Sequence, residues 1–125
     1  MAAWKAASSI IVVSRSTGRV LVMQRGAGAK FMPNALVFPG GVATPSDEKL
    51  GPPTKIAALR ELFEETGLII DHHESAATSK NLMELQEKTK DNPENFKLVC
   101  CSSRLVQFYS RVSYLRPVLV HQSIG

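Results

Sequence analysis

Hydrophobic positions in the first third of the chain form short runs that are typical of β-strands. Residues 9–13 and 19–25 are rich in valine, isoleucine and leucine, and the segment between them ends at Gly18. A glycine-ended turn between two such runs predicts a β-hairpin. Residues 35–38 predict a third short strand, which Pro39, Gly40 and Gly41 should end.

The middle of the chain changes to a helical pattern. Residues 43–54 are rich in proline, glycine and charge and predict a loop, after which Thr54 should cap a helix over residues 55–66 that stops at Gly67. Residues 68–70 predict a fourth strand. Residues 79–90 and 93–101 predict two amphipathic helices, and residues 105–120 should contain a last strand, at a sheet edge because of Pro117.

The helix over residues 55–66 carries the candidate chemistry. At 100° per residue, Glu61, Glu64 and Glu65 share one face, opposite the apolar side chains Ile56, Leu59 and Phe63. Arg60 lies one turn before Glu64 and could orient it. Carboxylates near a helix C-terminus repel one another and the helix dipole, and a divalent cation such as Mg²⁺ or Mn²⁺ would remove both costs. The alternative is a solvated acidic face.

Composition and charge limit the classes of protein that fit. The 125 residues suffice for one domain, and no uncharged apolar run reaches the roughly 18 residues of a membrane span. All 11 acidic residues lie between Asp47 and Glu94, whereas both ends of the chain are basic, which suits an anionic ligand held near a bound cation. The adjacent Cys100 and Cys101 favour a reducing, intracellular compartment over a disulfide framework.

Two segments around this helix resemble the sequence box of the Nudix hydrolases. Phe38-Pro39-Gly40-Gly41 precedes the loop, and residues 60–68, RELFEETGL, match the second half of the box at every fixed position. In the first half, Asp47 stands where the family has glutamate, and 12 residues instead of seven separate it from Arg60, so the resemblance assigns Asp47 no role.

The resemblance implies hydrolysis of a diphosphate linkage with Mg²⁺ or Mn²⁺. It implies that Glu61 and Glu65 are metal ligands, that Glu64 is a ligand or the general base, and that Arg60 belongs to the catalytic residues. The implied fold is α/β, a mixed sheet sandwiched between helices in a single domain over residues 8–125, with the box at residues 41–68 and a helical insert at about residues 79–101.

Residues 21–25 (LVMQR), 31–33 (FMP) and 38–41 (FPGG) further resemble the coenzyme A diphosphatase branch, whose signature has an arginine upstream of FPGG. The long loop and the insert are similar to its peroxisomal and mitochondrial members. The implied substrate is coenzyme A or acyl-CoA, cleaved to (acyl)phosphopantetheine and adenosine 3′,5′-bisphosphate. Arg25, with Lys30, is the candidate for the ribose phosphate, and the other candidate substrate contacts are Phe38, Gly40 and Gly41. The alternative for Arg25 is an ordinary surface arginine.

Two other functions fit the same residues. One is a Nudix reaction on NADH, ADP-ribose or capped RNA, and the other is a catalytically weak Nudix-like binding module. We expect no nucleic-acid surface, because the arginines after residue 103 lack the density of one. Peroxisomal members often end in a Ser-Lys-Leu-like tripeptide, whereas this chain ends in Ser123-Ile124-Gly125. Only residues 105–125 follow the insert, so we expect a sheet short of strands, self-association and poor hydrolysis.

Overall fold

The strand β1 (Lys5–Ser9) is the centre of a three-stranded antiparallel sheet in the computed structural model, which describes residues 4–14, 16–70, 79–103 and 118–120. β4 (Gly40–Val42) pairs with β1 on one side, with Ser8 opposite Gly41, and β5 (Val118–Val120) pairs with it on the other. The strand expected within residues 105–120 is confirmed at β5, at a sheet edge; residues 104–117 lie outside the described part. A mixed sheet was expected, but the described pairings are antiparallel.

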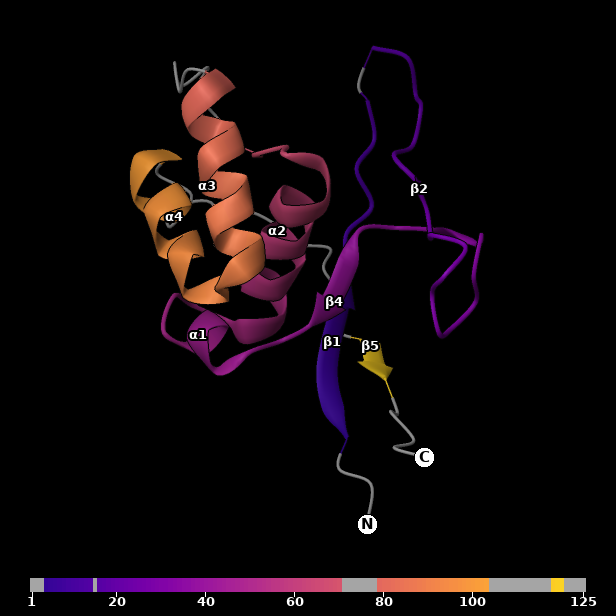
Figure 1. Ribbon diagram of the computed structural model, residues 1–125, viewed down its shortest axis with the longest axis horizontal. Helices are drawn as coiled ribbons and strands as arrows, with labels where there is room; N and C mark the ends of the chain where they lie inside the picture. Colours follow the sequence, from indigo (N-terminus) through magenta and orange to yellow (C-terminus); the bar gives the residue numbers. More distant parts are fainter. Residues whose placement is uncertain (1–3, 15, 71–78, 104–117, 121–125) are drawn as a thin grey trace.

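The predicted N-terminal hairpin is confirmed, but its arms pair only in places. The Leu21 amide donates to the Val12 carbonyl, the Ser14 amide donates to the Arg19 carbonyl, and Val13 and Val20 form a bridge. The regular ladder lies further along, where β2 (Met23–Gln24) pairs with β3 (Leu36–Val37). We call residues 10–38, of which residue 15 lies outside the described part, the arm. Figure 1 shows the arm projecting on the side of β1 and β4 away from the helices.

The helices follow the predicted order. α2 (Pro53–Thr66) packs against β1 and β4, and it ends at Gly67, whose φ of 73° is the left-handed conformation that glycine adopts without strain. α3 (Ser79–Asp91) packs on α2, and η1 (Pro93–Asn95) leads into α4 (Phe96–Ser103). In Figure 1 these helices gather on one side of β1 and β4. The described helices include none long and apolar enough to cross a membrane.

The core lies where α2 meets α4. The predicted apolar face of α2 is confirmed, since Ile56, Leu59 and Phe63 are all buried. The ring of Phe63 lies 6.3 Å from that of Phe96, measured between centroids and tilted by 40°. Burial of such aromatic and aliphatic side chains typically contributes about 1.5–3 kcal/mol each. This contact fixes the rotation of α2 about its axis and thereby sets the direction of its acidic face.

Four local predictions were wrong. Thr54 does not cap α2: Pro52 occupies the N-cap and Pro53 the first helical position, where a missing amide proton costs nothing. Residues 68–70 form no strand; Ile69 and Ile70 pack on the core without a ladder partner. The predicted loop over residues 43–54 contains the short helix α1 (Pro45–Glu48).

The fourth correction concerns the two glycines that were expected to end a strand. They form β4 instead, because β1 approaches them very closely. A Cβ atom on Gly40 would overlap the Ser8 carbonyl oxygen, and one on Gly41 would overlap the Glu61 carboxylate. The absence of side chains therefore lets β4 fit between β1 and α2.

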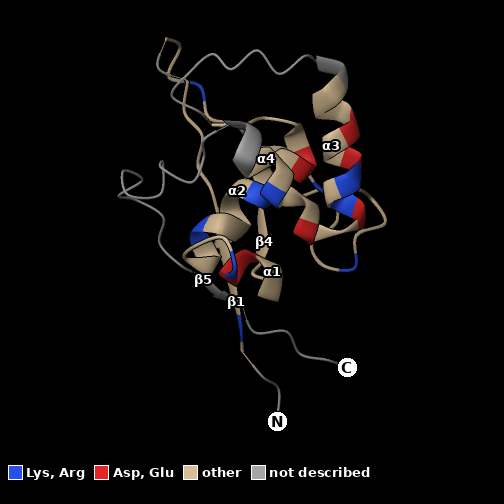
Figure 2. Ribbon diagram, turned by 90° about the vertical axis from the view of Figure 1, so that its left-hand side faces the viewer, with Lys and Arg blue, Asp and Glu red and all other residues tan. Residues whose placement is uncertain are grey.

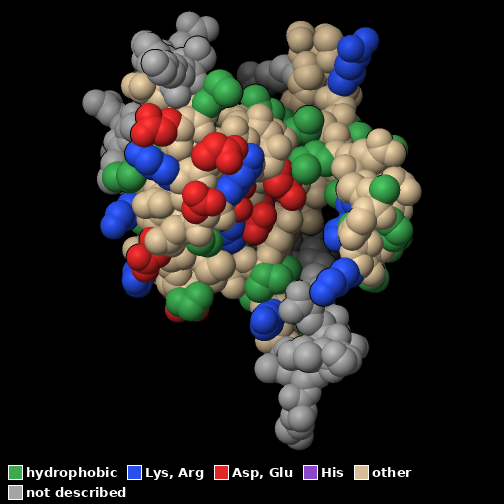
Figure 3. All heavy atoms as spheres, in the orientation of Figure 1, with side chains coloured by type: hydrophobic (Ala, Val, Ile, Leu, Met, Phe, Trp, Pro, Cys, Tyr) green, Lys and Arg blue, Asp and Glu red, His purple; other side chains and the backbone are tan. Residues whose placement is uncertain are grey.

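The arm exposes many apolar side chains. Those at least 40% exposed on it are Ile11, Val13, Val20, Val22, Phe31, Met32, Leu36 and Phe38. Figure 3 shows hydrophobic side chains spread over this part of the surface. An exposed apolar surface of this kind favours association with other molecules. Self-association of the chain stays a prediction.

The packing of β4 predicts different effects for two glycine-to-alanine changes. Gly40→Ala would push a methyl group into backbone atoms of β1 that cannot move aside, so we expect the free energy of unfolding to fall by about 2 kcal/mol or more. Gly28→Ala meets no atom within 4 Å and serves as the matched control. Chemical denaturation of both variants measures the difference, and equal stability would contradict the close packing of β4 on β1.

Candidate active site

The buried guanidinium of Arg60 organises the candidate site. Its side chain is 2% exposed, and each of its five N–H groups has an acceptor. Nε and Nη2 donate to the two carboxylate oxygens of Asp47, at 2.9 and 3.2 Å, and Nη2 also donates to the Val42 carbonyl at 3.1 Å. Arg60 therefore joins α2 to α1 and to β4.

The third nitrogen of the guanidinium, Nη1, binds two of the three predicted metal ligands. Nη1 donates to Glu61 Oε1 at 2.9 Å and to Glu64 Oε1 at 3.1 Å. The second of these bonds is the contact between Arg60 and Glu64 that helical spacing predicted. Both carboxylates are largely buried, with 18% and 13% of their side chains exposed.

Asp47 reaches Arg60 through the short helix that the sequence did not predict. The Thr44 amide and hydroxyl both donate to Asp47 Oδ2, at 2.8 and 2.9 Å, which fixes the carboxylate at the start of α1. Asp47 is 1% exposed, and the long spacing to Arg60 is taken up by α1 and the turn after it. The Thr-x-x-Asp pattern at residues 44–47 is a helix-start signal, and it could have identified this position.

Glu65, the last acid of α2, bonds to β4. Its Oε2 accepts from the Gly40 amide at 3.3 Å, so it connects the end of α2 to β4. The backbone of the same helix end is held from α3, where Gln86 Nε2 donates to the Glu64 carbonyl at 2.9 Å. The three carboxylates lie at one end of one helix, but in the described part of the chain no three candidate ligands converge on one point.

Burial and crowding shift the ionisation of these groups. Loss of solvent raises the pKa of Glu64, and the attraction of Arg60 only partly opposes it. Loss of solvent also raises the pKa of Glu65, against the bond from Gly40, and repulsion by Glu61 and Glu64 adds to the rise. For Arg60, burial lowers the pKa, but the bond to Asp47 and the surrounding carboxylates outweigh it and raise the pKa. Loss of solvent is thus the main cause of the raised pKa of Glu64 and Glu65, and neighbouring negative charge adds to it.

This donor set fits a divalent metal ion. Three carboxylates, those of Asp47, Glu61 and Glu64, share one guanidinium, and Glu65 lies at the end of the same helix. Hard oxygen ligands with excess negative charge are what Mg²⁺ and Mn²⁺ prefer. Glu61, Glu64 and Glu65 would hold such an ion, whereas Asp47 is committed to Arg60 and to the start of α1. Figure 2 shows that the acidic central part of the chain forms α1, α2 and α3, with basic residues interspersed.

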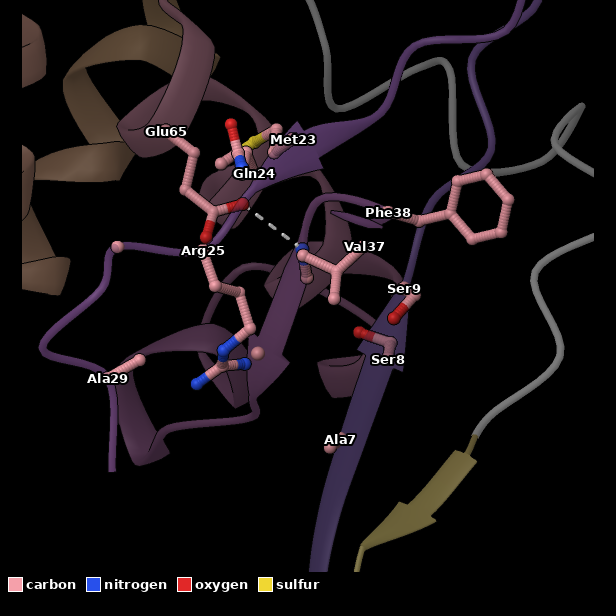
Figure 4. A pocket seen from close by; sticks show the side chains of 13 residues that line it. Ala7, Ser8, Ser9, Met23, Gln24, Arg25, Ala29, Val37, Phe38 and Glu65 are labelled. Carbon is pink, nitrogen blue, oxygen red and sulfur yellow. Dashed lines mark hydrogen bonds between the residues drawn. The ribbon is translucent and has the colours of Figure 1, made fainter. Parts of the chain in front are cut away.

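A pocket of about 590 Å³ opens beside Glu65, between β1, β4 and the arm. The predicted substrate contacts Arg25, Phe38, Gly40 and Gly41 all line it, and Lys30 does not. Figure 4 shows Arg25 extending into the pocket from the arm and Glu65 at its edge. The guanidinium of Arg25 lies 5.9 Å from the centre of the Phe31 ring, which is within the range of a cation–π interaction. Sequence reasoning missed Ser8 and Gln24, which also line the pocket and carry no motif.

Comparison with known proteins places this geometry in a family. The family model of the NUDIX domain matches residues 4–113. The chain is 38% identical over 110 residues to a Caenorhabditis elegans protein named "Putative nudix hydrolase 7", and the match covers 84% of this chain and 37% of that protein. The chain thus spans little more than a third of the length of that relative. No solved structure matches the chain. Together with RELFEETGL on α2 and its carboxylates beside a pocket, the family match shows that the chain belongs to the Nudix family.

Proposed function

We propose that the chain is the Nudix domain of a metal-dependent hydrolase that cleaves the diphosphate linkage of coenzyme A or acyl-CoA. The observation that carries the proposal is that Glu65, from the acidic end of α2, lines the same pocket as Arg25. A volume of about 590 Å³ is in the range of small-molecule sites. Opposite charges at the two sides suit a substrate that has an anionic group at a distance from a metal-bound diphosphate.

The family's chemistry requires a group that neutralises the diphosphate. A divalent ion held by Glu61, Glu64 and Glu65 would supply that charge and lower the pKa of a coordinated water. Glu64 acts as a ligand or as the general base. Arg60 holds Glu61 and Glu64 by hydrogen bonds. At 2% exposure, its side chain is too deeply buried to contact substrate. Its role is to position these carboxylates.

Arg25 carries the choice of coenzyme A within the family. Its guanidinium lies in the pocket and is partly buried, which strengthens a charge-assisted bond to a phosphate monoester such as the one on the ribose of coenzyme A. Phe38, 40% exposed beside the pocket, offers a ring for an apolar or aromatic part of the substrate. Incubation with Mg²⁺ or Mn²⁺ and coenzyme A, NADH, ADP-ribose or capped RNA, with mass analysis of products, tests the proposal. Preferential cleavage of another substrate would overturn the coenzyme A assignment, and no cleavage of any would favour a binding module.

Removal of the charge of Glu64 or of Glu65 should abolish turnover without unfolding the protein. We expect Glu64→Gln and Glu65→Gln to reduce kcat at least a hundredfold, because each removes a metal-facing charge. Since burial raises the pKa of both groups, the ionised forms are held at a cost, so the metal-free variants should be as stable as the parent or slightly more stable. Unchanged hydrolysis in both folded variants would contradict the metal-binding face.

Gly41→Ala should disturb the site through Glu61. The new methyl group would meet the end of the Glu61 side chain, which can swing aside, so we expect a loss of stability of about 1–3 kcal/mol, from the Arg60 donor left unpaired. The displaced carboxylate would leave its place beside Arg60, and we expect kcat to fall at least tenfold. Measurement of kcat against Mn²⁺ concentration and of unfolding by denaturant tests both parts. Full activity in a stable Gly41→Ala protein would show that the position of Glu61 is unimportant.

Arg25→Ala should distinguish substrates that differ by one phosphate. A charge-assisted hydrogen bond typically contributes about 1.5–3 kcal/mol, so we expect coenzyme A affinity to fall at least tenfold and dephospho-coenzyme A affinity to change little. Lys30→Ala, an exposed residue outside the pocket, is the matched control for loss of a positive charge. Calorimetric titration of both ligands gives the comparison. Equal losses on both would mean that Arg25 does not recognise the ribose phosphate.

A further inference from the structure

The pocket contains two buried polar atoms that the protein leaves unsatisfied. Among the described residues, the buried side-chain polar atoms that lack a hydrogen-bond partner are Ser8 Oγ and Arg25 Nε. Both residues line the same pocket. A buried donor without a partner typically costs about 1–3 kcal/mol, so two of them in one cavity call for an explanation.

The position of Ser8 in the sheet determines the direction of its side chain. Ser8 is the next-to-last residue of β1, is 3% exposed, and stands opposite Gly41 in the antiparallel ladder. Directly opposite residues of such a ladder project on the same face of the sheet. The Cβ position of Gly41 faces Glu61, so Ser8 projects on the face that α2 covers. Figure 4 shows the Ser8 hydroxyl directed into the pocket and the Arg25 side chain entering from the opposite wall.

The chemistry of the two atoms defines what would satisfy them. Arg25 Nε can only donate, and a serine hydroxyl can donate or accept. A group that accepts from both and also matches the positive charge of the guanidinium is an oxyanion. Glu65, the carboxylate among the residues that line the pocket, already accepts from the Gly40 amide. It makes no hydrogen bond to Arg25 Nε or to Ser8 Oγ, so an oxyanion of a bound ligand would satisfy both atoms.

We propose that Ser8 is a substrate contact that, together with Arg25, binds one phosphate group of the substrate, with the Ser8 hydroxyl donating to a phosphate oxygen. This inference rests on the proposed function for the nature of the substrate. The phosphate is either the diphosphate that is cleaved or the additional phosphate monoester. A serine that served only the fold would gain nothing from an unpaired hydroxyl, and alanine would fill the same space without the cost.

The test compares Ser8→Ala with Ser16→Ala, which removes the same hydroxyl from the exposed hairpin turn. Calorimetric titration without metal uses coenzyme A, dephospho-coenzyme A, ADP and adenosine 3′,5′-bisphosphate as probes. We expect Ser8→Ala to weaken phosphate binding about tenfold and Ser16→Ala to leave it unchanged. A loss limited to coenzyme A and adenosine 3′,5′-bisphosphate places Ser8 at the monoester, and a loss limited to coenzyme A, dephospho-coenzyme A and ADP places it at the diphosphate.

The melting temperature of Ser8→Ala distinguishes a ligand contact from a structural role. Because Ser8→Ala removes an unpaired buried group, the melting temperature of the ligand-free variant should equal or exceed that of the parent, while its increase on ligand addition shrinks. Combination with Arg25→Ala should cost less than the two separate losses together, because both residues hold one phosphate. A lower melting temperature with unchanged affinities would overturn the proposal and make Ser8 structural.

The two hypotheses fail in different ways. If the parent hydrolyses coenzyme A and Ser8→Ala binds every probe as tightly as the parent, the Ser8 contact is refuted and the proposed function stands. If the parent hydrolyses no diphosphate but Ser8→Ala loses affinity for ADP, the phosphate contact stands and the proposed function is refuted.

Discussion

The buried guanidinium of Arg60 is the interaction on which the rest of the site depends. An arginine at 2% exposure is stable only if its charge is matched and its donors are all bound, and here each of the five N–H groups has an acceptor. Those acceptors come from α1, from β4 and from α2 itself. One side chain thus fixes the relative positions of three elements, and removal of any single acceptor would leave a buried donor unpaired.

The same arrangement explains why the site carries an excess of negative charge. Asp47 takes one side of the guanidinium, so the single positive charge that Glu61 and Glu64 share is already partly neutralised. Glu65 makes no hydrogen bond to Arg60; it accepts from the Gly40 amide and is attracted by Arg25. Loss of solvent then raises the pKa of Glu64 and Glu65, and the positive charge nearby offsets this rise only in part. The protein holds this excess of negative charge next to an open pocket, which is where a cation can reach it.

The sequence correctly predicted the features of α2 that depend on local interactions. The acidic and apolar faces of α2 follow from helical periodicity, and the stop at Gly67 follows from the left-handed conformation that its φ of 73° requires. The wrong predictions concern places where tertiary contacts outweigh local preference. Gly40 and Gly41 read as a strand end in isolation, but they form β4 because a strand with side chains could not fit between Ser8 and Glu61. Residues 68–70 have strand-like composition, yet Ile69 and Ile70 pack against the core and form no strand.

Residues that act through position alone leave the weakest signal in a sequence. Asp47 differs in type and spacing from the family's glutamate, and only its place at the start of α1 brings it to Arg60. Ser8 belongs to no motif, and its interest arises from an unpaired hydroxyl in a pocket that four separate segments of chain create. Both cases follow from the same constraint. The two glycines of β4 let β1 and α2 come together, so Glu65 of α2 and Ser8 of β1 line one cavity. Polar groups that cost stability there are the ones best placed to bind a ligand.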